Sequence, residues 1–232
     1  MVYPELPARV AEVRGRIAAA AARGGHGQAV RLIAVTKTHG PEAVREAWAA
    51  GITDVGENKV QEAVGKQEAL ADAECTRGGV RWHLIGHLQT NKAKALPRFA
   101  LFHALDRDGL VEAADAVGRK VGRPLDVLVQ VNISGEATKG GYAPTEVPAL
   151  AERLHSATGL VVRGVMTMAP FDADEASLRT VFRGAREAQA VLGAAGHPAV
   201  ELSMGMSGDY EVAAEEGATL VRLGTVLFGA RG

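Results

Sequence analysis

The feature that most constrains this chain is a repeated alternation of two sequence patterns. Short runs rich in Val, Ile and Leu are followed, again and again, by Ala- and Glu-rich stretches with helical periodicity. Strands are predicted at residues 30–35, 54–56, 82–85, 101–104, 125–131, 160–165, 200–203 and 220–223. The 54–56 strand is short, and it is retained because the spacing of the pattern requires one there. Strands that alternate with helices indicate parallel β/α units.

The stretches between these strands predict the helices. We place them at residues 41–50, 60–71, 91–96, 109–121, 145–155, 175–192 and 208–216. Thr145 and Asp174 stand where N-caps are expected, and Gly159 and Gly217 stand where a glycine commonly ends a helix.

Eight strands are the number that closes a (β/α)8 TIM barrel, whose usual length is about 250 residues. The alternative is a doubly wound open sheet, but the first strand is followed by TKTHGPEA and not by G-x-G-x-x-G. The β/α units also continue to the C-terminus without the signal of a second domain. We therefore expect an α/β fold, a (β/α)8 barrel, with residues 1–232 in a single domain.

The first 25 residues predict an extra N-terminal helix. Val10, Val13 and Ile17 share one face, and charged residues interrupt any signal-peptide layout. No full helix follows the eighth predicted strand, and strands one and eight are neighbours in a closed barrel. We expect the N-terminal helix to cover that gap.

Composition excludes several functional classes. The formal net charge is −1, so nothing predicts a nucleic-acid partner. The sequence holds no long apolar span, so no membrane association is expected. Cys75 is the single cysteine and is predicted to lie in a loop as a bystander. It cannot form an internal disulfide, which fits a cytoplasmic protein.

In a barrel, chemistry belongs at the carboxyl ends of the strands. The loops after strands seven and eight read SMGMSGD and RLGTVLFG, and barrels often bind phosphate there. Ser207 precedes a helical stretch, Gly224 permits close approach of a backbone N–H, and Thr225 adds a hydroxyl. The alternative for Ser207 is a plain helix N-cap.

Two cationic residues lie in or directly after predicted buried strands. Lys37 follows the first buried strand, where partial desolvation and nearby cations would make its amine more able to form a Schiff base. The alternative is a solvated lysine at the start of a loop. Arg222 interrupts the apolar run LVRLGTVLF, so it requires a partner, which is either a structural ion pair or a ligand atom.

His83 and His87 have the i, i+4 spacing of metal ligands on a helix. They straddle a strand end instead, so we expect a core His83, a loop His87 and no metal site.

The motifs AVTKTH, GENKVQE, WHLIGHLQTNK, QVNISGEATKGGY, VRGVMTM, ELSMGMSGDYEVA and VRLGTVLFG occur in this order. Together they resemble the pyridoxal 5'-phosphate homeostasis protein family over nearly the whole chain. That family is a single-domain relative of the alanine racemase N-terminal barrel, fold type III of the pyridoxal-phosphate proteins.

The resemblance implies a pyridoxal 5'-phosphate cofactor and a role for each of seven residues. It implies that Lys37 holds the cofactor as an internal aldimine and that Arg222 faces the pyridine nitrogen. It further implies that Ser207, Gly224 and Thr225 hold the phosphate. Asn58 and the backbone around Met204 would line the ring.

The resemblance also bears on activity. An arginine at the ring nitrogen makes the cofactor a weaker electron sink than an aspartate would. Alanine racemases add a β-rich domain and a catalytic tyrosine from the partner subunit, and we expect this chain to lack both. Tyr142 or Tyr210 could replace that tyrosine. No catalytic residue is therefore assigned.

The sequence is compatible with three functions. The first is a monomeric carrier in vitamin B6 and amino-acid homeostasis, with apo forms of pyridoxal-phosphate enzymes as possible recipients. The second is a pyridoxal-phosphate-dependent amino acid racemase. The third is a cofactor-free Schiff-base aldolase acting on a sugar phosphate through Lys37.

Overall fold

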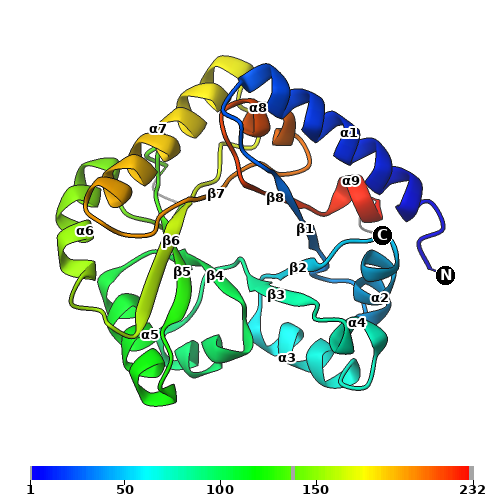
Figure 1. Ribbon diagram of the computed structural model, residues 1–232, viewed down its shortest axis with the longest axis horizontal. Coiled ribbons are helices and arrows are strands. Elements are labelled where there is room, and N and C mark those ends of the chain that lie inside the picture. Colours follow the sequence, from blue (N-terminus) through cyan, green and yellow to red (C-terminus); the bar gives the residue numbers. More distant parts are fainter. Residues whose placement is uncertain (1, 137–138, 230–232) are drawn as a thin grey trace.

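A computed structural model describes residues 2–136 and 139–229 of the chain. Its parallel strands pair in sequence order, and the pairing of the first strand with the eighth closes a barrel (Figure 1). The strands are β1 (Arg31–Val35), β2 (Asp54–Glu57), β3 (Arg81–Leu84), β4 (Leu101–Leu105), β5 (Leu125–Gln130), β6 (Leu160–Met166), β7 (Glu201–Ser203) and β8 (Leu220–Leu223). The predicted (β/α)8 barrel is confirmed, including the short strand at Asp54–Glu57.

Helices surround the barrel on its outer side (Figure 1). They are α1 (Leu6–Gly24), α2 (Pro41–Ala49), α3 (Val60–Ala69), α4 (Glu74–Arg77), the 3-10 helix η1 (Thr90–Arg98), α5 (Asp108–Val121), the 3-10 helix η2 (Pro144–Glu146), α6 (Val147–Leu154), α7 (Glu175–Ala194), α8 (Tyr210–Glu215) and α9 (Thr225–Phe228). Buried Leu, Val, Ile and Ala side chains from both layers form the hydrophobic core. No helix in the described ranges has the length and apolar character needed to cross a membrane.

The N-terminal helix covers the side of the barrel that the short final helix leaves open. α1 packs against α8 and α9, and Figure 1 shows it lying across this side of the barrel. Its buried face carries Leu6, Val10, Val13, Ile17 and Ala20. Arg9 Nη1 donates to the carbonyl oxygen of Leu227 at 3.2 Å, which ties α1 to α9. The N-terminal helix therefore lies where the sequence predicted it, over the gap that follows the eighth strand.

Residues 91–96 are helical as predicted, within the 3-10 helix η1, which contains Pro97. Three other local expectations were wrong. Thr145 is not an N-cap, because it lies inside η2, whose N-cap position is Ala143, and Gly159 does not end α6, whose C-cap is His155. Cys75 does not lie in a loop, because it belongs to the short helix α4 and its side chain is buried. It belongs to the hydrophobic core as a small apolar residue.

Candidate functional site at the barrel mouth

The loops after β7 and β8 meet at one point of the barrel mouth. Ser207 Oγ accepts hydrogen bonds from the backbone N–H of Gly224 and of Val226, each at 3.3 Å. Thr225 lies between these two donors and begins α9. Ser207 does not cap α8, whose N-cap position is Asp209, so the N-cap interpretation was wrong. The group is a cluster of N–H and hydroxyl donors, the type of arrangement that holds an oxyanion such as phosphate.

Lys37 lies in the turn that follows β1, beside this cluster. A Cβ atom at Gly224 would lie 3.5 Å from the carbonyl oxygen of Val35, so the β8 end touches the β1 end. At the other end of α9, the rings of Phe228 and His39 have centroids 5.1 Å apart. Lys37 stands in the chain between these two contacts, and its side chain is half-buried.

A buried ion-pair group holds the residues on both sides of Lys37. Lys66 Nζ, on α3, donates to the carbonyl oxygen of Thr36 at 2.7 Å and to Glu57 Oε1 at 2.7 Å. It also donates to Glu62 Oε1 at 2.8 Å, and the same oxygen accepts the backbone N–H of Thr38. The Lys37 turn is therefore fixed from outside the barrel.

The turn is also strained. Thr38 has a φ of 69°, a left-handed value that β-branched residues rarely adopt. Such a conformation costs on the order of 1–3 kcal/mol and persists where surrounding contacts impose it. The bond from Thr38 N–H to Glu62 is one such contact.

Burial has the largest effect on the pKa of the Glu57 carboxyl. The side chain is completely buried at the end of β2, and this burial raises the pKa of its carboxyl against the opposing effect of Lys66 and Thr36. Its Oε2 atom is buried with no hydrogen-bond partner in the described part of the chain. The Glu57–Lys66 pair is therefore a charge pair removed from water, whose members depend on each other.

Arg222 lies inside the barrel and is almost completely buried. Its guanidinium donates to Ser203 Oγ at 2.6 Å and to the carbonyl oxygen of Thr167 at 2.9 Å. Across the described ranges no carboxylate comes within ion-pair distance of it, so the structural ion pair considered from the sequence is wrong. Burial lowers the pKa of Arg222 to about 10, which still leaves it charged at neutral pH.

Asn58 and Met204 follow β2 and β7 in the chain. Asn58 follows β2 and is half-buried, and a Cβ atom at Gly86 would lie 2.4 Å from its carbonyl oxygen, so this contact requires glycine. Met204 is completely buried, and its backbone N–H donates to the carbonyl oxygen of Leu220 at 3.1 Å. The structure thus brings the Lys37 turn, Ser207, Gly224 and Thr225 together, with Arg222 deeper on β8.

Neither tyrosine named as a replacement acid–base group has an available hydroxyl at the mouth. Tyr142 donates to Asp108 Oδ1 at 2.8 Å, and burial followed by that bond raises the pKa of its hydroxyl strongly. Tyr210 begins α8 and lies under Arg16 of α1, with its ring centroid 5.7 Å from the guanidinium carbon. Burial raises its pKa as well.

The two histidines lie where the sequence predicted them, His83 in the core and His87 in a loop. His83 is buried inside the barrel, whereas His87 is exposed beyond β3 and lies 2.8 Å from Asp106 Oδ2. In the described residues, no group of three or more His, Cys, Asp and Glu side chains could hold a metal ion.

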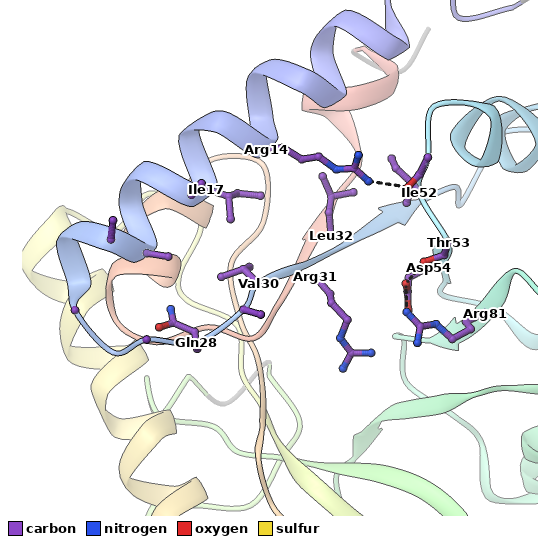
Figure 2. A pocket seen from close by; sticks show the side chains of 17 residues that line it. Arg14, Ile17, Gln28, Val30, Arg31, Leu32, Ile52, Thr53, Asp54 and Arg81 are labelled. Atoms are coloured by element: carbon purple, nitrogen blue, oxygen red, sulfur yellow. Dashed lines mark hydrogen bonds and ion pairs between the residues drawn. The ribbon is translucent and has the colours of Figure 1, made fainter.

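A cavity of about 780 Å³ lies at the opposite, N-terminal end of the barrel. Figure 2 shows Arg14, Arg31 and Arg81 reaching toward it from α1, β1 and β3. These arginines have partners: Gly51 O for Arg14, Glu201 for Arg31 and Asp54 for Arg81. This cavity does not include the residues of the mouth site.

Two parts of the site could not be found from the sequence. The donor N–H of Val226 belongs to the backbone of an apolar segment, and the sequence pattern gives no sign of it. Lys66 resembles any helical surface lysine, and only its i, i+4 spacing from Glu62 hints at pairing. Its burial follows from contacts with Thr36 and Glu57 that are remote in sequence.

The fold and the mouth site define a class, the barrels of the alanine racemase type. The profile of the alanine racemase N-terminal domain family matches residues 10–232. An alanine racemase from Streptomyces lavendulae has the same fold, with a TM-score of 0.74 over 94% of this chain and 57% of that one, at 18% identity.

Within that class, nearer relatives share one name. A pyridoxal phosphate homeostasis protein of Aquifex aeolicus is 42% identical over 226 residues, which are 96% of this chain and 97% of that protein. The Pseudomonas aeruginosa protein of the same name is 43% identical over 224 residues, 96% of this chain and 94% of that one. The chain belongs to the pyridoxal phosphate homeostasis protein family. PipY of Synechococcus elongatus, solved with PLP bound, is 36% identical with a TM-score of 0.84, covering 97% of this chain and 100% of that one.

Proposed function

We propose that this protein binds pyridoxal 5'-phosphate reversibly, as a Schiff base on Lys37, and acts in vitamin B6 and amino-acid homeostasis in the cytoplasm. The observation that carries the proposal is the meeting of Ser207 Oγ with the N–H groups of Gly224 and Val226 beside the Lys37 turn. These donors suit a phosphate, and a lysine amine within the same mouth suits an aldehyde. The names of the relatives and the PLP bound in PipY support the same ligand.

Each residue has a proposed task. Ser207, Gly224 and Thr225 hold the phosphate, Asn58 and the backbone at Met204 line the ring, and Arg222 directs an N–H toward the pyridine nitrogen. Bound there, pyridoxal phosphate supplies an aldehyde and an electron-withdrawing ring. Arg222 stays protonated and can only donate, so it does not stabilise a protonated ring nitrogen as a carboxylate would.

Carriage is favoured over amino-acid racemisation by the two tyrosines. Racemisation requires an acid–base group facing Lys37, and Tyr142 is engaged by Asp108 while Tyr210 lies outside the barrel against α1. Both hydroxyls also have raised pKa values, which makes them poor proton carriers near neutral pH. We further propose that residues 1–232 act as one domain in a monomer and that apo enzymes receive the cofactor.

The test is the absorption spectrum of the protein mixed with pyridoxal phosphate. The wild type should show the visible band of an imine, and borohydride should bleach the band and leave the cofactor's mass on a peptide containing Lys37. Lys37→Ala should show neither change. Lys59→Ala is the matched control, because Lys59 is an exposed lysine in the loop after the neighbouring strand.

Two results would contradict the proposal. A colourless, borohydride-trapped adduct of Lys37 with a sugar phosphate, without binding of pyridoxal phosphate, would indicate an aldolase. Steady conversion between amino-acid enantiomers that disappears in Lys37→Ala would indicate a racemase. Chiral chromatography after long incubation with the loaded protein measures the second.

A further inference from the structure

A continuous line of hydrogen bonds crosses the barrel interior from Arg222 toward the opposite end. Arg222 Nη1 contacts Ser203 Oγ at 2.6 Å, and Ser203 Oγ lies 2.8 Å from His103 Nδ1. His103 Nε2 lies 2.9 Å from His83 Nδ1, and His83 Nε2 lies 2.8 Å from Asp54 Oδ1. All five side chains are buried, and they come from five different strands.

The far end of the line opens on the cavity at the N-terminal end of the barrel. Figure 2 shows Asp54 there, joined to Arg81, whose Nη2 donates to Asp54 Oδ2 at 2.6 Å. Thr53 Oγ1 donates to the same oxygen at 2.8 Å. One oxygen of Asp54 therefore accepts from Arg81 and Thr53, and the other accepts from His83.

With both imidazoles neutral, the chemistry of the two end groups fixes the direction of every bond. A carboxylate only accepts, so His83 carries its proton on Nε2 and its Nδ1 accepts from His103 Nε2–H. His103 Nδ1 is then an acceptor and receives a hydrogen bond from the Ser203 hydroxyl. Ser203 Oγ in turn accepts from Arg222, which only donates. One arrangement of protons, with both imidazoles neutral, satisfies the whole line.

The charges around the line agree with neutral imidazoles. Complete burial is the main reason that the pKa of His103 lies well below its ordinary range, and the charges of Arg222 and Arg31 act in the same direction. Burial also lowers the pKa of His83, against the opposing influence of Asp54. Burial by itself would raise the pKa of Asp54, but hydrogen bonds from His83, Arg81 and Thr53 outweigh it and leave that pKa well below its usual value.

We infer that Ser203, His103, His83 and Asp54 form a one-directional hydrogen-bond line that orients Arg222 and connects its positive charge to a carboxylate at the far end of the barrel. No carboxylate in the described ranges lies within ion-pair distance of Arg222, and the charge of Asp209 acts on it from a greater distance. Ser203 and the carbonyl oxygen of Thr167 engage one N–H on each terminal nitrogen of Arg222. Ser203 and His103 are thus positioning residues for Arg222, and the inference rests on the proposed role of Arg222 toward the cofactor's ring nitrogen.

The first test needs no cofactor. In wild-type protein labelled with ¹⁵N at histidine, long-range ¹H–¹⁵N spectra should show His83 and His103 both neutral and protonated at Nε2 from pH 6 to pH 8. Either ring protonated at Nδ1, or charged at neutral pH, would overturn the inference. Because this measurement uses the wild type, it does not depend on whether a variant folds.

The second test asks whether the line positions Arg222. Ser203→Ala removes the hydroxyl that links Arg222 to His103, and it should weaken binding of pyridoxal phosphate by about tenfold, the usual effect of losing one charge-assisted hydrogen bond. Ser203→Thr retains the hydroxyl and should restore most of the affinity. His155→Gln, on the exposed outer surface, controls for the handling of variants. Equal affinity of Ser203→Ala and wild type would overturn the positioning role.

The two hypotheses fail in different ways. If wild type and Lys37→Ala give the same spectrum with pyridoxal phosphate, the proposed function fails while the histidine protonation pattern remains a valid result. If the histidine pattern differs, or Ser203→Ala binds normally, the hydrogen-bond line is not a positioning device and the proposed function stands.

Discussion

Lys66 shows at the scale of one residue how a buried charge fixes a neighbouring turn. It is the cation that neutralises Glu57, and both groups are almost completely removed from water. Lys66→Met should lower the free energy of unfolding by about 3–5 kcal/mol, because it leaves the Glu57 carboxylate buried with the Thr36 hydroxyl but without a positive charge beside it. Urea denaturation followed by circular dichroism measures this.

A double-mutant cycle supplies the control for Lys66. Glu57→Gln combined with Lys66→Met removes both charges, so the double variant should be more stable than Lys66→Met alone. Strictly additive losses would contradict the interpretation that the cost comes from an unpaired buried carboxylate.

Asp54 should give the protein a measurable dependence on acid. Its folded pKa lies below the ordinary value of 3.8, so its stabilising contribution is complete above that pH and is lost as the pH falls through 3.8 toward the lower folded value. Asp54→Asn should cost about 1–3 kcal/mol at pH 7, from weakened charge-assisted bonds.

Unfolding in urea at a series of pH values between 7 and 3 tests this expectation. The difference between wild type and Asp54→Asn should shrink at the acid end. A difference that stays constant over the series would show that Asp54 does not titrate as described. Asp172→Asn, which changes an exposed carboxylate, controls for the loss of one negative charge.

Residue identities at strand ends could be predicted, whereas their partners could not. Lys37, Ser207 and Gly224 follow strands whose ends must meet at one rim of a parallel barrel. His103, in contrast, contacts Ser203 one hundred positions away, and that contact depends on the register of every strand between them. The proposed roles of Asn58 and Met204 came from the family resemblance, and they remain predictions.

At the scale of elements, α1 acts as part of the barrel's outer layer. Ile17 is 5% exposed on its inner face. Ile17→Ala should therefore lower the free energy of unfolding by about 2–5 kcal/mol, through lost burial and the cavity that remains. Val2→Ala is the matched control, since Val2 is 59% exposed and its loss should change stability little. Equal effects of the two substitutions would contradict the packing of α1.

The elements that sequence patterns predicted well are those with a strong apolar period. β5 and β6 are long runs of Val and Leu, and their positions are found within a residue or two. The helix at residues 91–96 was predicted from residue types, which do not distinguish an α-helix from the 3-10 geometry of η1. Four-residue helices such as α4 are too short to show a period, which is why Cys75 was placed in a loop.

At the scale of the whole molecule, the proposed cofactor should stabilise the fold by mass action. Free pyridoxal phosphate at one hundred times its Kd should add about 2.7 kcal/mol to the free energy of unfolding, if it binds only the folded chain. Differential scanning calorimetry should show the matching rise in Tm for the wild type and Lys59→Ala. Lys37→Ala should show a much smaller rise, and an equal rise would place the binding energy elsewhere.

The pairing of β1 with β8 has a consequence for how the protein is made. Lys37 lies near the start of the chain, whereas Ser207 and the N–H groups of Gly224 and Val226 lie almost at its other end. During synthesis the lysine emerges long before the cluster that would receive the phosphate. A nascent chain therefore carries the amine without the anion site, and the complete mouth forms only after the last strand joins the first. Retention of a phosphorylated aldehyde would then report that the barrel has closed.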